Sequence, residues 1–212
     1  MTSPSSRTPR GSTPPFEPSA DELVLHASGR KTAEDRLPGD PSPAALIDRF
    51  LRVDQAGEHG AVRIYQGQLA VLGRRSANVG VLRHMLAQEE VHLATFDKLV
   101  ADRRARPTLL GPLWHVAGFA LGAGTALLGE KAAMACTTAI EEAIDGHYKD
   151  QYDRLGDDEL PLKATIDTFR REELEHRDIG YANGARQAPA FPVLSGAIKA
   201  GAKLAIWVSE RV

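Results

Sequence analysis

The stretch EEAIDGHYKDQYDRLGDDELPLKATIDTFRREELEH, residues 141–176, decides the fold because acidic residues stand inside its helical apolar pattern. Glu141 lies seven residues before Tyr148, and Glu173 lies three residues before His176. Between these pairs a Gly-Asp-Asp triplet interrupts the pattern and predicts a short turn. Apolar residues spaced by three and four on both sides of the turn predict two antiparallel amphipathic helices.

The same chemical pattern occurs earlier in the chain, in EHGAVRIYQGQLAVLGRRSANVGVLRHMLAQEEVH. Glu58 lies seven residues before Tyr65, and Glu89 lies three residues before His92. A single Glu-x-x-His is a weak motif, but the whole pattern recurs after about 83 residues, which indicates an internal repeat. The sequence therefore predicts two helical hairpins, with helices at about 44–73, 77–103, 130–155 and 159–183.

Each predicted helix carries a glutamate within its apolar stripe, where an unpaired carboxylate would be very costly to bury. A glutamate and a histidine three residues apart share one face of a helix. Packing the hairpins together collects four carboxylates and two imidazoles, the ligand set of ferritin-like di-iron and di-manganese bundles. We therefore predict an all-α, ferritin-like four-helix bundle with two iron or manganese ions on Glu58, Glu89, His92, Glu141, Glu173 and His176.

Other ionisable residues near these positions have less specific interpretations. The neighbouring glutamates are interpreted as solvated side chains or supports of the ligands: Glu90, Glu142, Glu172 and Glu175. Three histidines are interpreted as surface or interfacial: His59, His84 and His115. Asp54 and Asp145 lie one helical turn from ligand glutamates and are predicted to orient the metal-binding histidines, with ordinary surface charge as the alternative. A functional role for His147 stays open at this point.

Residues 107–129 contain no Asp, Glu, Lys or Arg, and this run is long enough to cross a bilayer. A single crossing would put the two hairpins on opposite sides of the membrane and divide the predicted metal site. We therefore expect the segment to lie in the membrane interface, or to enter the membrane and return, beside an amphipathic helix at 193–208. The alternative is a buried crossover helix.

Composition excludes several classes of function and site. The 212 residues carry a net charge of −2, which argues against a generalised nucleic-acid surface, and Cys136 is the single cysteine, which excludes a multi-cysteine metal site. Residues 1–40 are rich in Pro, Ser and Thr and are predicted to be disordered, before one domain at 41–212. They lack the apolar segment of a secretory signal; an organellar targeting role is the alternative to a plain tail.

At the quoted motifs the chain resembles the demethoxyubiquinone hydroxylases, through DQAGEHGAVRIYQGQLAVLG, AQEEVHL, REELEHRDIG and the uncharged run. The resemblance covers about residues 44–212. It implies a di-iron centre on the six ligands named above and a catalytic pair at His147 and Tyr148. It also implies a monooxygenase that uses O2 to hydroxylate the benzoquinone ring of a demethoxyubiquinone-type polyprenyl intermediate in ubiquinone biosynthesis.

The resemblance also implies partners. NADH is the implied electron source, although the sequence shows no dinucleotide-binding fingerprint. A membrane surface, a lipid-binding partner protein and a homo-oligomer are further implied partners. The expected location is peripheral, on the cytoplasmic face of a bacterial inner membrane, or on the matrix side of the mitochondrial inner membrane in a eukaryote. The alternatives are a ferritin- or rubrerythrin-like iron oxidase or peroxidase, which does not need the uncharged run, and a metal-free membrane adaptor bundle, which leaves four core carboxylates unexplained.

Overall fold

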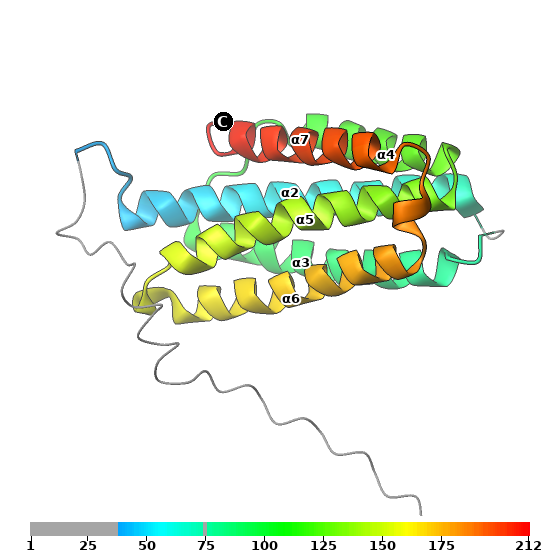
Figure 1. Cartoon of the computed structure of the whole chain (residues 1–212). Helices are drawn as coiled ribbons and strands as arrows, with labels where there is room; N and C mark the ends of the chain where they lie inside the picture. Colours follow the sequence, from blue (N-terminus) through cyan, green and yellow to red (C-terminus); the bar gives the residue numbers. More distant parts are fainter. Residues whose placement is uncertain (1–37, 74–75) are drawn as a thin grey trace, which may run out of the picture. The chain divides into compact units, whose positions relative to one another are not determined.

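The computed structural model describes residues 38–73 and 76–212, and these residues form six α-helices, two short 3-10 helices and no strand. Four long helices form the bundle (Figure 1): α2 (Pro43–Leu72), α3 (Val79–Arg103), α5 (Glu130–Arg154) and α6 (Leu160–Ala182). Their ends lie within two residues of the predicted ends, and the prediction of an all-α, ferritin-like bundle is confirmed. The predicted disordered tail lies outside the described residues, apart from its last three positions.

Sequence explains where the bundle helices begin and which face they bury. The Ser42 side chain accepts a hydrogen bond of 3.1 Å from the Ala45 backbone N–H, and Pro43 occupies the first helical turn of α2. The buried face of α3 is a single stripe spaced by three and four residues: Leu82, Met85, Glu89, His92, Phe96 and Val100. The acid and the imidazole stand in the middle of this stripe, so the packing that buries the apolar residues buries them too.

Two of the three apolar clusters among the described residues lie toward opposite ends of the bundle. One contains Phe96 and Tyr148, and the other contains Met85 and Tyr65. Each fully buried large apolar side chain contributes about 1.5–3 kcal/mol relative to an exposed one. Both tyrosines turn their hydroxyls to glutamates of the predicted site, so the acidic residues lie between two apolar layers.

Helix α4 (Gly111–Leu127) packs closely against α2 through glycines. A Cβ atom at Gly122 would overlap the Ile64 carbonyl, and one at Gly118 would lie 2.7 Å from the Gly60 carbonyl oxygen. The opposite side of α4 is open, since Val116 is 65% and Leu127 is 75% exposed. The alternative of a buried crossover helix is therefore wrong.

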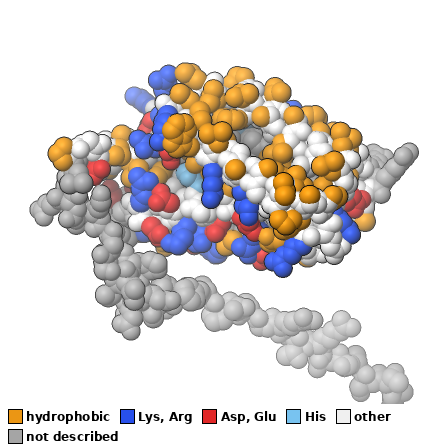
Figure 2. Space-filling model, turned by 45° about the horizontal axis from the view of Figure 1, so that its top comes forward, with side chains coloured by type: hydrophobic (Ala, Val, Ile, Leu, Met, Phe, Trp, Pro, Cys, Tyr) orange, Lys and Arg blue, Asp and Glu red, His pale blue; other side chains and the backbone are white. Residues whose placement is uncertain are grey.

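Helix α7 (Phe191–Ser209) lies beside α4 over the α2–α5 side of the bundle (Figure 1). The Trp114 indole N–H donates to the Ser209 hydroxyl at 3.1 Å and ties the two helices together. Hydrophobic side chains gather on the face formed by α4 and α7 (Figure 2), among them Leu113, Val193 and Trp207, each more than half exposed. The two helices thus form an exposed apolar layer, while its contact with a membrane stays a prediction.

Among the described helices, α7 is the one whose length and composition would allow it to cross a membrane. Its most apolar 18-residue stretch has a mean hydropathy of 1.3, and 11% of that stretch is buried. The uncharged run at residues 107–129, which is long enough in sequence to cross a bilayer, contains the 17-residue helix α4.

Candidate metal centre

The structure brings together all six predicted ligands. Two buried groups of four residues form, and within each group one ligand atom from every residue lies within 4.8 Å of the others. The two groups share Glu89 and Glu173, so they are two halves of one centre. One half adds Glu58 and His92 from the first hairpin, and the other adds Glu141 and His176 from the second: each half therefore contains ligands from both hairpins.

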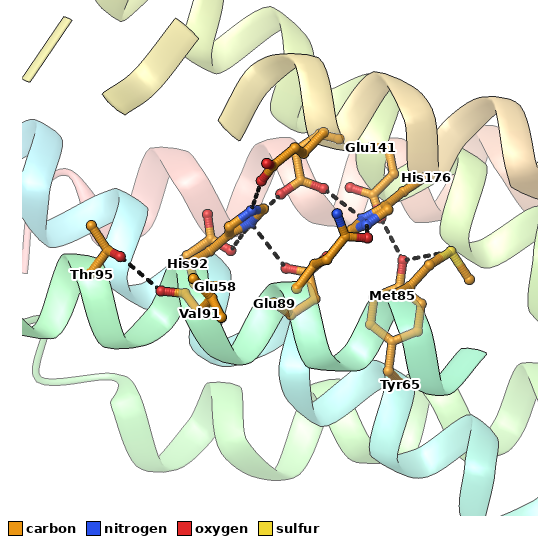
Figure 3. A network of polar contacts seen from close by, with 12 residues as sticks. Glu58, Tyr65, Met85, Glu89, Val91, His92, Thr95, Glu141 and His176 are labelled. Atoms are coloured by element: carbon orange, nitrogen blue, oxygen red, sulfur yellow. Dashed lines mark hydrogen bonds and ion pairs between the residues drawn. The ribbon is translucent and has the colours of Figure 1, made fainter. Parts of the chain in front are cut away.

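The inner ring nitrogens of both histidines face the carboxylates (Figure 3). His92 Nδ1 lies 3.0 Å from a Glu173 oxygen and 3.6 Å from a Glu58 oxygen. His176 Nδ1 lies 3.1 Å from oxygens of both Glu89 and Glu173. Glu173 therefore contacts both imidazoles, whereas Glu89 contacts His176 and lies 4.0 Å from His92.

The outer ring nitrogens contact Glu172, for which the sequence left open a role as a support of the ligands, and Gln88, to which the sequence assigned no role. His92 Nε2 lies 2.6 Å from a Glu172 oxygen, and His176 Nε2 lies 3.0 Å from the Gln88 amide oxygen. These acceptors orient the imidazoles. The signal was present in the sequence, because Gln88 and Glu172 immediately precede the two shared glutamates.

The prediction that Asp54 and Asp145 orient the metal-binding histidines is wrong. Asp145 accepts a hydrogen bond of 2.6 Å from Arg170, and Asp54 accepts one of 2.6 Å from Gln151. A residue one turn away on the same helix lies beside a ligand glutamate, whereas the outer nitrogen of each histidine points to the helix of the other hairpin. The acceptor therefore has to come from that facing helix.

The other ionisable residues near the predicted ligands are partly or fully exposed and take no part in the buried centre. Glu142 pairs with Lys199 at 2.9 Å and connects α5 to α7, while Glu90 and Glu175 are exposed. His59 Nε2 lies 3.2 Å from His115 Nδ1 and joins α2 to α4. The expectation of surface or interfacial histidines is confirmed for this pair.

Burial dominates the electrostatics of the centre. It raises the pKa of Glu58, Glu89 and Glu141, and the charge of Glu173 adds to each rise. Burial also opposes ionisation of Glu173, but hydrogen bonds with His176 and His92 lower its pKa. Several ionised carboxylates in one buried site repel one another unless cations or protons compensate their charge.

Unpaired oxygen atoms at the same place fit divalent cations. Among the described residues, Glu58 Oε2, Glu89 Oε2 and Glu141 Oε2 are buried and have no hydrogen-bond donor. Carboxylate oxygens together with imidazole nitrogens suit iron and manganese, and two divalent ions would balance the charge of four carboxylates. The residues present therefore fit a dinuclear metal centre.

The predicted catalytic pair lies at the edge of this centre. The Tyr148 hydroxyl donates to a Glu58 oxygen, and burial raises the pKa of Tyr148 well above its usual value. His147 is one step further out, with Nε2 3.3 Å from Asp54 Oδ1. Tyr148 thus contacts a predicted ligand directly, while the partly exposed His147 belongs to a polar group with the buried Asp54 and Gln151.

An apolar cavity that the sequence analysis did not predict lies between α2, α4, α5 and α7. Its volume is about 470 Å³, and its lining includes Gly57, Ile140, Ile144 and Ile198. Gly57 and Ile140 immediately precede Glu58 and Glu141, so the cavity lies against the two helices that supply these ligands. Its lining residues are scattered over four helices, and no local motif marks them.

A helical bundle with paired Glu-x-x-His helices and a buried carboxylate centre defines the class of ferritin-like carboxylate proteins. Within that class, the chain belongs to the family described as ubiquinone biosynthesis protein COQ7, which it matches over residues 45–209. The resemblance to the demethoxyubiquinone hydroxylases is thereby confirmed.

Relatives from animals, fungi and bacteria carry hydroxylase names. The chain is 49% identical to the human "NADPH-dependent 3-demethoxyubiquinone 3-hydroxylase, mitochondrial" over 89% of its own length and 90% of the relative. It is 43% identical to the Saccharomyces cerevisiae "5-demethoxyubiquinone hydroxylase, mitochondrial", over 80% and 79%. It is 34% identical to the Chromobacterium violaceum "3-demethoxyubiquinol 3-hydroxylase", over 77% and 78%.

Proposed function

We propose that this protein is a di-iron monooxygenase that uses O2 to hydroxylate the benzoquinone ring of a demethoxyubiquinone-type polyprenyl intermediate. The observation that carries the proposal is the convergence of Glu58, Glu89, His92, Glu141, Glu173 and His176 in a member of this hydroxylase family. When bound, two iron ions would supply the electron transfer and oxygen chemistry that amino-acid side chains lack.

The protein's own residues hold this centre and keep it dry. Glu89 and Glu173 serve both halves, while Tyr65 and Tyr148 hold the two remaining glutamates by hydrogen bonds. The apolar layers above and below exclude water from the carboxylates. We assign to His147, which lies 3.3 Å from Asp54 and next to Tyr148 in the chain, the second place in the proposed catalytic pair.

The substrate has a polar ring and a long apolar tail, and two features suit that chemistry. The cavity between α2, α4, α5 and α7 is lined largely by apolar side chains and lies against the ligand helices. It is bounded by the same two helices, α4 and α7, that form the exposed apolar face. We propose that this face rests on a membrane and that the quinone enters the cavity from the lipid.

The proposed location is peripheral, on the membrane that holds ubiquinone. The names of the eukaryotic relatives specify mitochondria, which supports the mitochondrial inner membrane for a eukaryotic source. The cytoplasmic face of the inner membrane is the corresponding site in bacteria. A reduced nicotinamide is the proposed electron donor; the human relative's name specifies NADPH, whereas the sequence resemblance implies NADH.

The test is complementation with chemical analysis. The chain is expressed in cells that lack their own quinone hydroxylase, and quinones extracted from the lipids are measured. We expect the demethoxy intermediate to disappear with the wild-type chain and to persist with Glu173→Ala. Persistence with a folded, iron-loaded wild-type chain would overturn the proposal and would favour an iron oxidase or peroxidase; failure to bind iron would favour an adaptor.

A further inference from the structure

The inner ring of the centre follows the sequence repeat closely. Residues in equivalent positions of the two halves play equivalent parts, in the pairs Glu58 and Glu141, Tyr65 and Tyr148, Glu89 and Glu173, and His92 and His176. Their contacts are equivalent too, because each tyrosine donates a hydrogen bond to the unshared glutamate of the opposite half: Tyr65 to Glu141, and Tyr148 to Glu58. The two halves of the proposed centre therefore match in their residues and in these contacts.

The hydrogen-bond partners of the outer histidine nitrogens differ between the two halves. Gln88 and Glu172 occupy equivalent positions, each directly before a shared glutamate, and each contacts the outer nitrogen of the opposite histidine. The acceptor is a neutral amide oxygen 3.0 Å from His176, but a carboxylate oxygen 2.6 Å from His92. At this contact one side-chain difference, amide against carboxylate, separates the two histidines.

A carboxylate behind an imidazole changes what the inner nitrogen offers to a cation. The outer N–H donates to Glu172, and this charge-assisted hydrogen bond pushes electron density toward His92 Nδ1. The Gln88 amide provides the same orientation for His176 without the charge. Phe169 stacks on the His92 ring with centroids 4.0 Å apart, which keeps water from that face of the imidazole.

We propose that the two halves of the centre bind metal unequally: the half with Glu58 and His92 binds a divalent cation first and more tightly, and the Gln88–Glu172 difference sets this order. The inference rests on the proposed dinuclear centre and adds to it an order of loading. Outer hydrogen-bond partners of metal-bound histidines typically change metal affinity by about 10- to 100-fold. We therefore expect about a tenfold difference between the halves.

The test measures Mn(II) binding to the full chain by the electron paramagnetic resonance signal of free Mn(II). Glu141→Ala leaves the His92 half intact, and Glu58→Ala leaves the His176 half intact. We expect the first variant to bind one Mn(II) about tenfold more tightly than the second. When Glu172→Gln is added to both variants, their Mn(II) affinities should become similar, because the tighter half is weakened. When Gln88→Glu is added to both instead, the affinities should also become similar, because the weaker half is strengthened.

The exchange variant Gln88→Glu with Glu172→Gln is the matched control, because it keeps composition and net charge and should reverse the order of the halves. Thermal unfolding of every variant without metal checks that the bundle is intact. Equal affinities of the two single-half variants, or an order unchanged by the exchange, would overturn the inference and leave the proposed centre standing. Absence of any Mn(II) or Fe(II) binding by the wild-type chain would overturn both.

Discussion

The Tyr65 hydroxyl donates a hydrogen bond of 3.0 Å to the Glu141 carboxylate, from the first half of the repeat to the second. Tyr148 makes the matching contact with Glu58 in the other direction. Each hairpin therefore positions a proposed metal ligand of its partner, and neither hairpin contains all the residues of one half of the proposed centre. This exchange explains why the two hairpins have to lie on the same side of any membrane.

Tyr65→Phe should lower the free energy of unfolding by about 1–3 kcal/mol, because a buried carboxylate oxygen loses its hydrogen-bond donor. Urea unfolding of the metal-loaded protein measures the change. Tyr181→Phe is the control: its hydroxyl donates to the half-exposed Glu142, where water replaces the lost donor. An equal loss in both variants would contradict the role assigned to Tyr65.

Glu173→Ala should reduce bound iron from about two ions per chain to less than one, because this glutamate belongs to both halves of the proposed centre. Anaerobic loading with Fe(II), removal of excess metal and metal analysis give the stoichiometry. Glu175→Ala, two residues away and exposed, should retain the wild-type content. Loss of iron in both variants would indicate a general effect of removing charge from α6.

Between pH 5 and 8 the metal-free protein should lose stability as the pH rises. The pKa values of Glu89 and Glu141 are raised by burial, and that of His176 is raised by Glu173 against the effect of burial. The folded chain therefore keeps protons that the unfolded chain releases, so this stabilisation is complete at low pH and is lost on titration upward. Glu173, with its lowered pKa, acts in the opposite direction only below about pH 4.5.

Each proton held only by the folded state contributes a fall of about 1.4 kcal/mol per pH unit, or about 3–5 °C in Tm. Calorimetric melting curves at fixed ionic strength measure it. With Mn(II) bound, cations replace these protons, and the fall should vanish or reverse. A metal-free Tm that rises from pH 5 to 8 would contradict the expected protonation.

The sequence predicted the helices and the six converging residues because both depend on local periodicity and on a repeated pattern. It did not predict Gln88 as the acceptor of His176, and it left Glu172 open between a solvated side chain and a support of the ligands, since both contacts cross between hairpins and depend on the packing angle. The cavity was missed for a similar reason: its lining residues, such as Ile144 and Ile198, are ordinary apolar residues until four helices pack around them. The pairing of Asp54 with His147 likewise joins positions 93 residues apart.

Gly122→Leu should destabilise the protein by about 2 kcal/mol or more, because a Cβ atom there overlaps the Ile64 carbonyl of α2 and forces the two helices apart. It should also weaken quinone binding, since α4 forms one wall of the cavity. Gly124→Ala is the control on the same helix, with open space around its Cβ position. It should stabilise α4 by about 0.5–1 kcal/mol, and denaturant unfolding distinguishes the two outcomes.

Leu113→Asp and Trp207→Asp should each weaken binding to phospholipid vesicles at least about tenfold. These side chains are 52% and 53% exposed on the face formed by α4 and α7. Removing a large apolar side chain from a lipid contact forfeits about 1.5–3 kcal/mol, and 1.4 kcal/mol corresponds to a factor of ten in affinity. Sedimentation with vesicles of defined composition measures the partition. Leu160→Asp is the matched control, because Leu160 is 58% exposed at the start of α6, outside that face. If all three variants bind vesicles as the wild type does, the apolar face serves another partner, and the quinone has to reach the cavity by a route other than the lipid.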